Sequence, residues 1–343
     1  MANKTVLVTG ANSFVAAQIL HRLFEVGYNV VGTVRSTTAA DKVRRSHGKY
    51  GDRLSLAIVP DIEAAGAFDE AVAKSDITGV IHTASPFHYP VDDNERDLFH
   101  PAVNGTLRIL EAVKKSGPSV KRVVITSSFA AVLDVNAGFR PGYTYTEKDW
   151  NPIGWEEAKT SAGGVAYCAS KEFAERAAWD FVEKEKPTFT IATLCPPMVY
   201  GPNGHFVDSL KGLNTSSATI WNLINGSQSE VPPTGFPACV DVRDLAEAHV
   251  RALTYPEAAG QRYIVASAAF TFQQIADIVR ADYPQLRDKV PEGKPGEPLP
   301  PMYVASNEKI KKELGIDFRP LKEIVHASVD SLLEIKERLG SEA

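Results

Sequence analysis

Cysteine is scarce in this chain, and so are long apolar segments. The 343 residues include three cysteines (Cys168, Cys195 and Cys239), so one stays unpaired even if the other two form a bridge. Reduced thiols, as in the cytosol, are the expected state. No apolar run approaches the roughly 18 residues that a transmembrane helix needs. The first predicted strand begins at Thr5, which leaves no room for a signal peptide. We therefore expect a cytoplasmic protein without a membrane partner.

A strongly basic surface and a metal-binding pattern are also missing. The net charge of −5 argues against a nucleic-acid partner, which would need a basic stripe. The eight histidines form no His-Glu-x-x-His or similar spacing, so no metal site is predicted. A hydrophobic content of 44% with 23% charged residues is typical of a globular enzyme. A small molecule is therefore the expected binding partner.

Short β-branched segments alternate with helical segments through the first half of the chain. Strands are predicted at Thr5–Thr9, Asn29–Val34, Leu54–Val59, Gly79–Thr83, Arg122–Thr126 and Thr190–Leu194. These strands lack polar alternation, which is typical of strands buried on both faces of a parallel sheet. Helical patterns between them, such as Val103–Ser116, indicate βαβ units. The predicted fold is α/β, a doubly wound parallel sheet of the Rossmann type.

The regular alternation ends after the strand at Thr190–Leu194. Segments 196–237 and 267–343 are richer in Pro and Gly, whereas Cys239–Val242 and Arg262–Val265 have strand character. We expect these two strands to return to the main sheet. The predicted division is a nucleotide-binding domain of residues 1–195 plus 238–266, and a smaller discontinuous substrate lobe of residues 196–237 plus 267–343.

A glycine turn follows the first strand, where a dinucleotide fingerprint would stand. Gly10 permits the tight turn, and the free N–H groups of the next helix, at Ser13, Phe14 and Val15, suit a pyrophosphate. Ser13 occupies a position where the pattern favours a second glycine. Its side chain either narrows the approach of phosphate to the backbone or donates its hydroxyl to a phosphate oxygen.

The next two strand ends carry residues suited to the adenosine half of a dinucleotide. Arg35 ends the second strand where an NAD enzyme would have an acid, and Lys42 follows it, which favours a 2′-phosphate. Asp61 and Ile62 follow the third strand. Two interpretations are open: Asp61 and Ile62 are expected to flank the adenine ring, or Asp61 is expected to be a helix N-cap.

The next strand end is made of small residues. Thr83 at the end of the fourth strand, with Ala84 and Ser85 after it, allows a close approach of cofactor.

A possible catalytic set lies further along the chain. Ser128 closes the fifth strand, and Tyr167 and Lys171 are four residues apart, so a helix places both on one face. A free phenol titrates near ~10, and a nearby ammonium lowers that value. Ser128 would hydrogen-bond a carbonyl oxygen as charge develops on it. Together with the glycine turn, the set indicates hydride transfer between a nicotinamide and a carbonyl.

The chain resembles the extended short-chain dehydrogenases/reductases over nearly its whole length. Within them it is similar to fungal NADPH-dependent methylglyoxal reductases and ketoreductases, which are related to plant dihydroflavonol reductases. The resemblance rests on a series of motifs. They are His82–Phe87, Glu95–Leu98, Pro101–Gly105, Thr126–Ser128, Trp150–Pro152, Tyr167–Lys171, Val199–Pro202 and Val240–Asp244.

The resemblance implies a role for each of these groups. It implies Ser128, Tyr167 and Lys171 as the catalytic set, Arg35 as the 2′-phosphate ligand, and Pro196 and Val199 beside the nicotinamide. The substrate pocket maps to Phe87, Phe129 and Met198. Relatives often have Tyr at the last two positions, so a more apolar pocket is expected here.

The predicted function is NADPH-dependent reduction of aldehydes and ketones to chiral alcohols. The expected substrates are ketoesters, aryl ketones and dicarbonyls of the methylglyoxal type, and the expected state is a monomer or a homodimer. One alternative is a nucleotide-sugar epimerase or dehydratase, which shares the Ser/Tyr/Lys set but needs an acid where Arg35 stands. Another is a regulator that binds NADP without turnover. Such proteins characteristically lose the Tyr–Lys pair.

Overall fold

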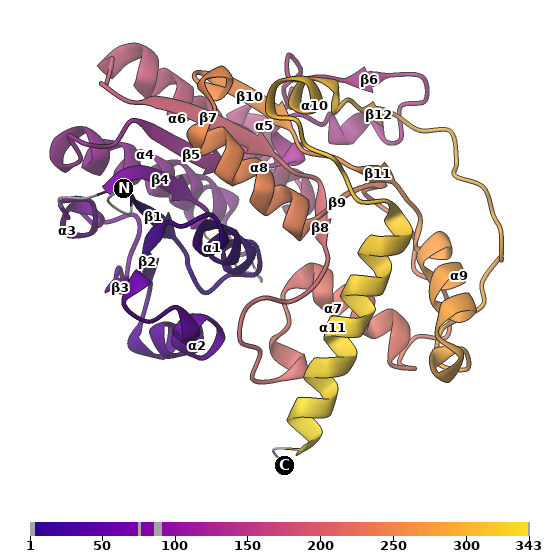
Figure 1. Ribbon diagram of the computed structural model, residues 1–343. Coiled ribbons are helices and arrows are strands. Elements are labelled where there is room, and N and C mark those ends of the chain that lie inside the picture. Colours follow the sequence, from indigo (N-terminus) through magenta and orange to yellow (C-terminus); the bar gives the residue numbers. More distant parts are fainter. Residues whose placement is uncertain (1–3, 75–76, 86–90, 342–343) are drawn as a thin grey trace.

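The core of the protein is a seven-stranded parallel sheet with helices on both faces (Figure 1). A computed structural model describes residues 4–74, 77–85 and 91–341. The strand order is β10-β7-β5-β4-β1-β2-β3. The strands are β1 Thr5–Thr9, β2 Asn29–Val34, β3 Leu54–Ile58, β4 Ile77–His82, β5 Arg122–Thr126, β7 Thr190–Cys195 and β10 Gln261–Ile264. The order reverses between β1 and β4, which is where doubly wound folds bind nucleotides.

The sheet forms because each central strand is apolar on both faces. In β1, Val6 and Val8 pack into one core cluster and Leu7 packs into the cluster on the opposite face. The first cluster lies under α1 (Phe14–Glu25), α2 (Thr37–His47), α8 (Val242–Thr254) and α10 (Glu308–Leu314). The second lies under α3 (Asp69–Val72), α4 (His100–Ser116) and α6 (Gly163–Glu185). The fold class predicted from the sequence is confirmed.

A second, smaller lobe lies beyond the carboxyl ends of the strands. It contains α7 (Thr215–Ile224), α9 (Phe272–Asp282) and α11 (Leu321–Ser341), which surround a separate apolar cluster (Figure 1). A short helix, α5 (Trp155–Lys159), precedes α6. Two short strands, one from the middle of the sequence and one from its C-terminal part, form a separate parallel pair. They are β6 (Thr144–Tyr145) and β12 (Val304–Ala305).

The expectation that Cys239–Val242 joins the main sheet was wrong. The observed strand β9 (Ala238–Asp241) lies in a three-stranded sheet between β8 (Met198–Tyr200) and β11 (Ala268–Ala269). Strand β7 already pairs with β5 on one side and β10 on the other, so the main sheet has no place for β9 beside it. Val242 begins α8, which Asp241 caps through the backbone N–H of Arg243. The division into two domains at the predicted boundaries stays a prediction.

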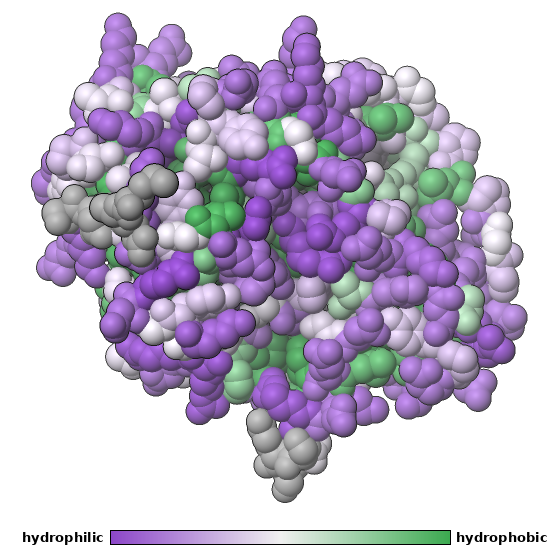
Figure 2. Space-filling view, in the orientation of Figure 1, coloured by the Kyte–Doolittle hydropathy of each residue, from purple (hydrophilic) through white to green (hydrophobic). Residues whose placement is uncertain are grey.

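The described surface is mostly polar. On the face shown in Figure 2, hydrophilic side chains cover most of the area, and hydrophobic ones appear in separate smaller areas. Among the residues that the structure describes, no helix combines the length and the apolar character that crossing a bilayer requires.

Candidate active site

The glycine turn after β1 has the geometry that a phosphate-binding turn needs. Gly10 has a φ of +66°, and a Cβ on it would lie 3.2 Å from the Cα of Ala84. Only glycine fits this position without strain, because both its dihedral angle and the neighbouring strand end exclude a side chain. Ser13 is the N-cap of α1, and its hydroxyl oxygen accepts the N–H of Ala16 at 3.3 Å. That capping bond leaves the hydroxyl proton of Ser13 able to donate to a ligand.

A cleft of about 380 Å³ lies at the carboxyl ends of β1, β2, β3 and β4. Its walls include eight of the residues predicted to bind cofactor. They are Gly10, Ser13, Arg35, Asp61, Ile62, Thr83, Ala84 and Ser85. The side chain of Arg35 is exposed at the end of β2, and no ion pair engages it among the described residues. The cleft therefore offers a helix N-terminus at one position and a free guanidinium at another.

Asp61 has a local role besides lining the cleft. Its carboxylate accepts the backbone N–H of Glu63 at 2.8 Å, which caps a turn rather than a helix, since α3 begins at Asp69. The alternative prediction, that Asp61 is the N-cap of a helix, is therefore wrong. Contact between Asp61 or Ile62 and adenine stays a prediction.

Three other predicted cofactor residues are not part of the walls of this cleft. Lys42 forms an ion pair with Asp208 at 2.7 Å, so the structure gives it a carboxylate partner instead. The ring of Phe14 is buried and meets the ring of His205 edge-on, with centroids 6.0 Å apart. Val15 is half-buried against the core. For Phe14 and Val15 only the backbone N–H groups remain as possible ligands, and the assignment of Lys42 stays a prediction.

The predicted catalytic residues come from β5 and α6. Ser128 follows β5, and its hydroxyl oxygen accepts the N–H of Ala130 at 3.1 Å, which caps a short turn. Tyr167 and Lys171 lie on α6, with the Lys171 Nζ 5.2 Å from the centre of the Tyr167 ring. Lys171 also donates to the hydroxyl of Ser85 at 2.6 Å. Because Ser85 lines the cleft, this hydrogen bond connects the catalytic helix to the predicted cofactor site.

Burial sets the protonation of two groups beneath the cleft. It lowers the pKa of Lys171 to about 8. It also lowers the pKa of His82, with a smaller contribution from the charge of Lys171, to about 4, so His82 is neutral near pH 7. Thr9 Oγ1 accepts the N–H groups of Thr83 and Ala84 and lies 2.9 Å from His82 Nδ1. The Thr9 hydroxyl therefore donates to Nδ1 and leaves the ring proton on Nε2.

The predicted nicotinamide and substrate residues lie near β7 and β8. Pro196 is buried, and its carbonyl accepts the N–H of Phe129 at 2.8 Å, while Val199 is half-buried on β8. Phe129 is 3% exposed and packs edge-on against Tyr145 at 5.6 Å. Met198 is half-buried against the core of the second lobe. Phe87 lies outside the described residues, and the pocket assigned to these side chains stays a prediction.

Sequence reasoning missed a buried hydrogen-bond network of three residues that begins next to Ser128. Ser127 donates to Glu175, which is buried on α6, and Glu175 in turn pairs with Arg262 on β10. One available signal was the spacing of four between Lys171 and Glu175, which places them on the same helix face.

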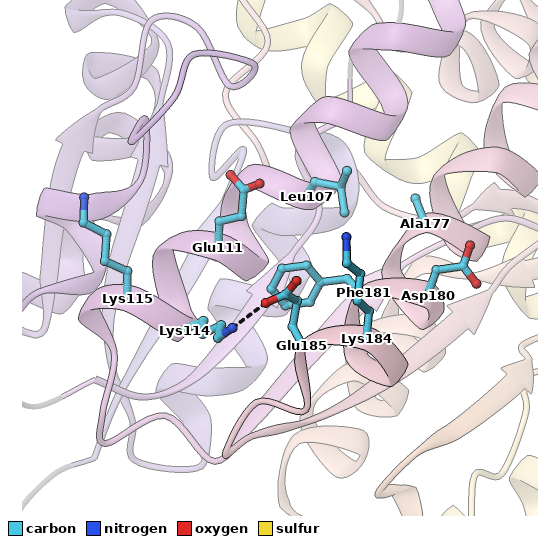
Figure 3. Close-up of a pocket in the computed structure, with 9 residues that line it drawn as sticks. All are labelled: Leu107, Glu111, Lys114, Lys115, Ala177, Asp180, Phe181, Lys184 and Glu185. Carbon is cyan, nitrogen blue, oxygen red and sulfur yellow. Dashed lines mark hydrogen bonds and ion pairs between the residues drawn. The ribbon is translucent and has the colours of Figure 1, made fainter.

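A hollow of about 730 Å³ lies elsewhere, between α4 and α6 (Figure 3). Charged side chains of both signs line it, and Lys114 pairs there with Glu185 at 2.5 Å. None of the motif residues reaches it. We therefore place the candidate active site at the cleft beside β1 and β4, which eight of the predicted cofactor residues line, and not in the larger hollow.

Fold and cleft together define a dinucleotide-binding protein of the Rossmann type. The family model described as the NAD dependent epimerase/dehydratase family matches residues 6–266, and the chain belongs to this family.

Among its relatives, the NADPH-dependent methylglyoxal reductase of Saccharomyces cerevisiae is 40% identical over 343 residues, covering 98% of this chain and 100% of the relative. A ketoreductase of Aspergillus niger is 41% identical over 336 residues, covering 96% and 98%. The crystal structure of yeast methylglyoxal/isovaleraldehyde reductase complexed with NADPH matches with a TM-score of 0.90 at 39% identity, covering 97% of this chain and 99% of that one. The resemblance inferred from the sequence is confirmed.

Proposed function

We propose that this chain is an NADPH-dependent carbonyl reductase that converts aldehydes and ketones to alcohols. The observation that carries the proposal is the hydrogen bond from Lys171 to Ser85, because it joins the Tyr-x-x-x-Lys helix to a cleft that also contains Arg35. The named activities of the similar reductases support the same class of oxidoreductase and the same cofactor.

The residues of the cleft fit the parts of NADPH. Gly10 leaves room where a Cβ would make tight contacts with Ala84, so the pyrophosphate could approach the backbone at the start of α1. Arg35 would hold the 2′-phosphate through charge-assisted hydrogen bonds, which NADH cannot offer. Lys171 would hold the ribose next to the nicotinamide.

The catalytic side chains have separate tasks in the proposed reaction. The reduced nicotinamide, when bound, supplies the hydride that the carbonyl carbon accepts. Ser128 donates a hydrogen bond to the carbonyl oxygen as negative charge develops there. Tyr167 transfers its phenolic proton to that oxygen, which completes the alcohol. The ammonium of Lys171, near the Tyr167 ring, favours the phenolate that remains.

We further propose that ketoesters, aryl ketones and dicarbonyls of the methylglyoxal type are substrates. In this proposal, Phe87, Phe129 and Met198 form an apolar wall beside the reacting carbonyl. The chain would act in the cytoplasm as a monomer or homodimer, which light scattering on the purified protein distinguishes.

The experiment is a spectrophotometric assay of NADPH oxidation with isovaleraldehyde, methylglyoxal and a ketoester, with chiral analysis of the products. Turnover with at least one of them is expected. Failure to oxidise NADPH with any of them, together with tight binding of NADPH, would favour a regulator. Tightly retained NAD and conversion of a nucleotide sugar would favour an epimerase.

A further inference from the structure

A buried carboxylate lies on the catalytic helix, two turns beyond Tyr167. Glu175 follows Lys171 by four residues on α6, so the three side chains share one face. Glu175 is 1% exposed. A carboxylate is almost never buried so fully unless it is paired, because the loss of hydration is costly. The surroundings of Glu175 must therefore supply both charge and hydrogen bonds.

Both oxygens of Glu175 are fully engaged. Oε2 accepts the hydroxyl of Ser127 at 2.6 Å, and Oε1 accepts the hydroxyl of Thr193 at 2.7 Å. Arg262 adds a fork, from Nε to Oε1 at 2.7 Å and from Nη2 to Oε2 at 3.1 Å. Burial alone would raise the pKa of Glu175, but the charge of Arg262 and these hydrogen bonds outweigh it and hold the pKa below its ordinary value. Glu175 is therefore ionised.

Arg262 extends the network from the edge strand β10 to the loops around Ser128. Its Nη2 donates to the carbonyl of Ala131 at 3.2 Å, and its Nη1 donates to the carbonyls of Glu147, at 3.2 Å, and Asp149. With the two bonds to Glu175, these contacts use all five N–H donors of the guanidinium. The guanidinium also lies 3.7 Å from the centre of the Trp150 ring.

The contacts fall on both sides of Ser128 in the chain. Ser127, the residue before it, is held by Glu175, and Ala131, three residues after it, is held by Arg262. Glu175 is itself fixed to the helix that carries Tyr167 and Lys171. The ion pair thus links the chain on both sides of Ser128 to the helix that carries the proton donor.

We propose that the Glu175–Arg262 pair is a positioning device for Ser128, which keeps its hydroxyl in register with Tyr167 and Lys171. The proposal rests on the role proposed for Ser128. A buried ion pair is weak evidence for stability, since apolar replacements are often as stable. The presence of charge at this place is better explained by a geometric requirement, because a misplacement of about 1 Å can cost on the order of 100-fold in rate.

The test is a mutant cycle with Glu175→Gln, Ser128→Ala and the double variant. Glu175→Gln should lower kcat by about 10-fold or more, while the Kd for NADPH, followed by fluorescence, changes little. In the Ser128→Ala background the same substitution should have little further effect on kcat, because it acts through Ser128. An additive loss in the double variant would overturn the proposal.

A matched control separates positioning from folding. Asp244 is also buried and pairs with Arg319, away from the cleft, so Asp244→Asn should lower Tm with kcat unchanged. If Glu175→Gln behaves in the same way, the pair is only structural. If Glu175→Gln does not fold, Ser127→Ala removes one tether without an unpaired charge. It should still lower kcat, and an unchanged kcat would refute the positioning role. Near-native turnover of Ser128→Ala alone would instead refute the role proposed for Ser128.

Discussion

The charge of Lys171 should set the alkaline limit of activity. Its pKa is lowered to about 8 because the ammonium is buried beside the cleft. A group with this pKa is about 90% charged at pH 7 and about 10% charged at pH 9. If the ammonium holds the ribose and assists Tyr167, the active fraction of free enzyme falls roughly tenfold over this interval. Activity should therefore fall as the pH rises, because the rise in pH deprotonates the ammonium of Lys171 that the proposed reaction needs.

The assay is kcat/KM for NADPH from pH 6 to 10 at saturating carbonyl substrate, since this ratio reports groups of the free enzyme. The profile of kcat should fall at higher pH than that of kcat/KM, because the phosphates of bound NADPH favour the charged form of Lys171. Lys171→Arg is the matched control, since a guanidinium stays charged throughout this range. Its alkaline limb should move beyond pH 9 even where its turnover is slower.

Two outcomes would refute this reasoning. A kcat/KM for NADPH that stays flat from pH 7 to 9.5 would show that the charge of Lys171 is not needed. A limb at the same pH in Lys171→Arg would assign the titration to a different group.

Four substitutions test the remaining assignments. Arg35→Ala should lower kcat/KM for NADPH on the order of 10–100-fold, through lost charge-assisted hydrogen bonds, and barely change that for NADH; equal losses with both cofactors would contradict the 2′-phosphate role. Tyr167→Phe should lower kcat by roughly 10²–10⁴ and leave the Kd for NADPH unchanged, whereas near-native turnover would exclude it as the proton donor. Ser13→Gly should lower the Kd for NADPH and cost a few tenths of a kcal/mol of capping energy, and a rise in Kd would make the hydroxyl a phosphate ligand. Met198→Ala should shift the enantiomeric ratio for bulky ketones, because small free-energy differences separate the two binding faces, and an unchanged ratio would remove Met198 from the pocket.

The main sheet could be predicted because the local sequence of each strand already indicates that the strand is buried. A continuous β-branched run such as Thr5–Thr9 suits a strand buried on both faces, and helical periodicity between such runs leaves little choice but a doubly wound sheet. Strand β9 shows the limit of this reasoning. Ala238–Asp241 is just as buried, but its partners are decided by which sheet edge is free, and that depends on β10, which follows it in the chain.

The cleft residues could be predicted because they occupy strand ends, and parallel strands of one sheet end at the same edge. Lys42 was less predictable, because a carboxylate from a distant loop, Asp208, competes for its charge. Glu175 was missed for a similar reason. In the sequence, one acid in a helix that also bears Lys, Glu and Arg is indistinguishable from a solvated residue. Its burial becomes apparent only from its contacts with β7 and β10 in the structure.

Two of the charged residues that follow Tyr167 on α6, Lys171 and Glu175, have separate partners. Lys171 and Glu175 have the i,i+4 spacing of helical ion pairs, in the less favourable order with the base first. Yet both oxygens of Glu175 are committed to Arg262, Ser127 and Thr193, and no ion pair of Lys171 with a carboxylate occurs among the described residues. A carboxylate beside Lys171 would raise its pKa and compete with Tyr167 for its charge. Arg262 balances the negative charge of Glu175. The ammonium of Lys171 is therefore left to contact Ser85 and the Tyr167 ring, which is where the proposed reaction requires it.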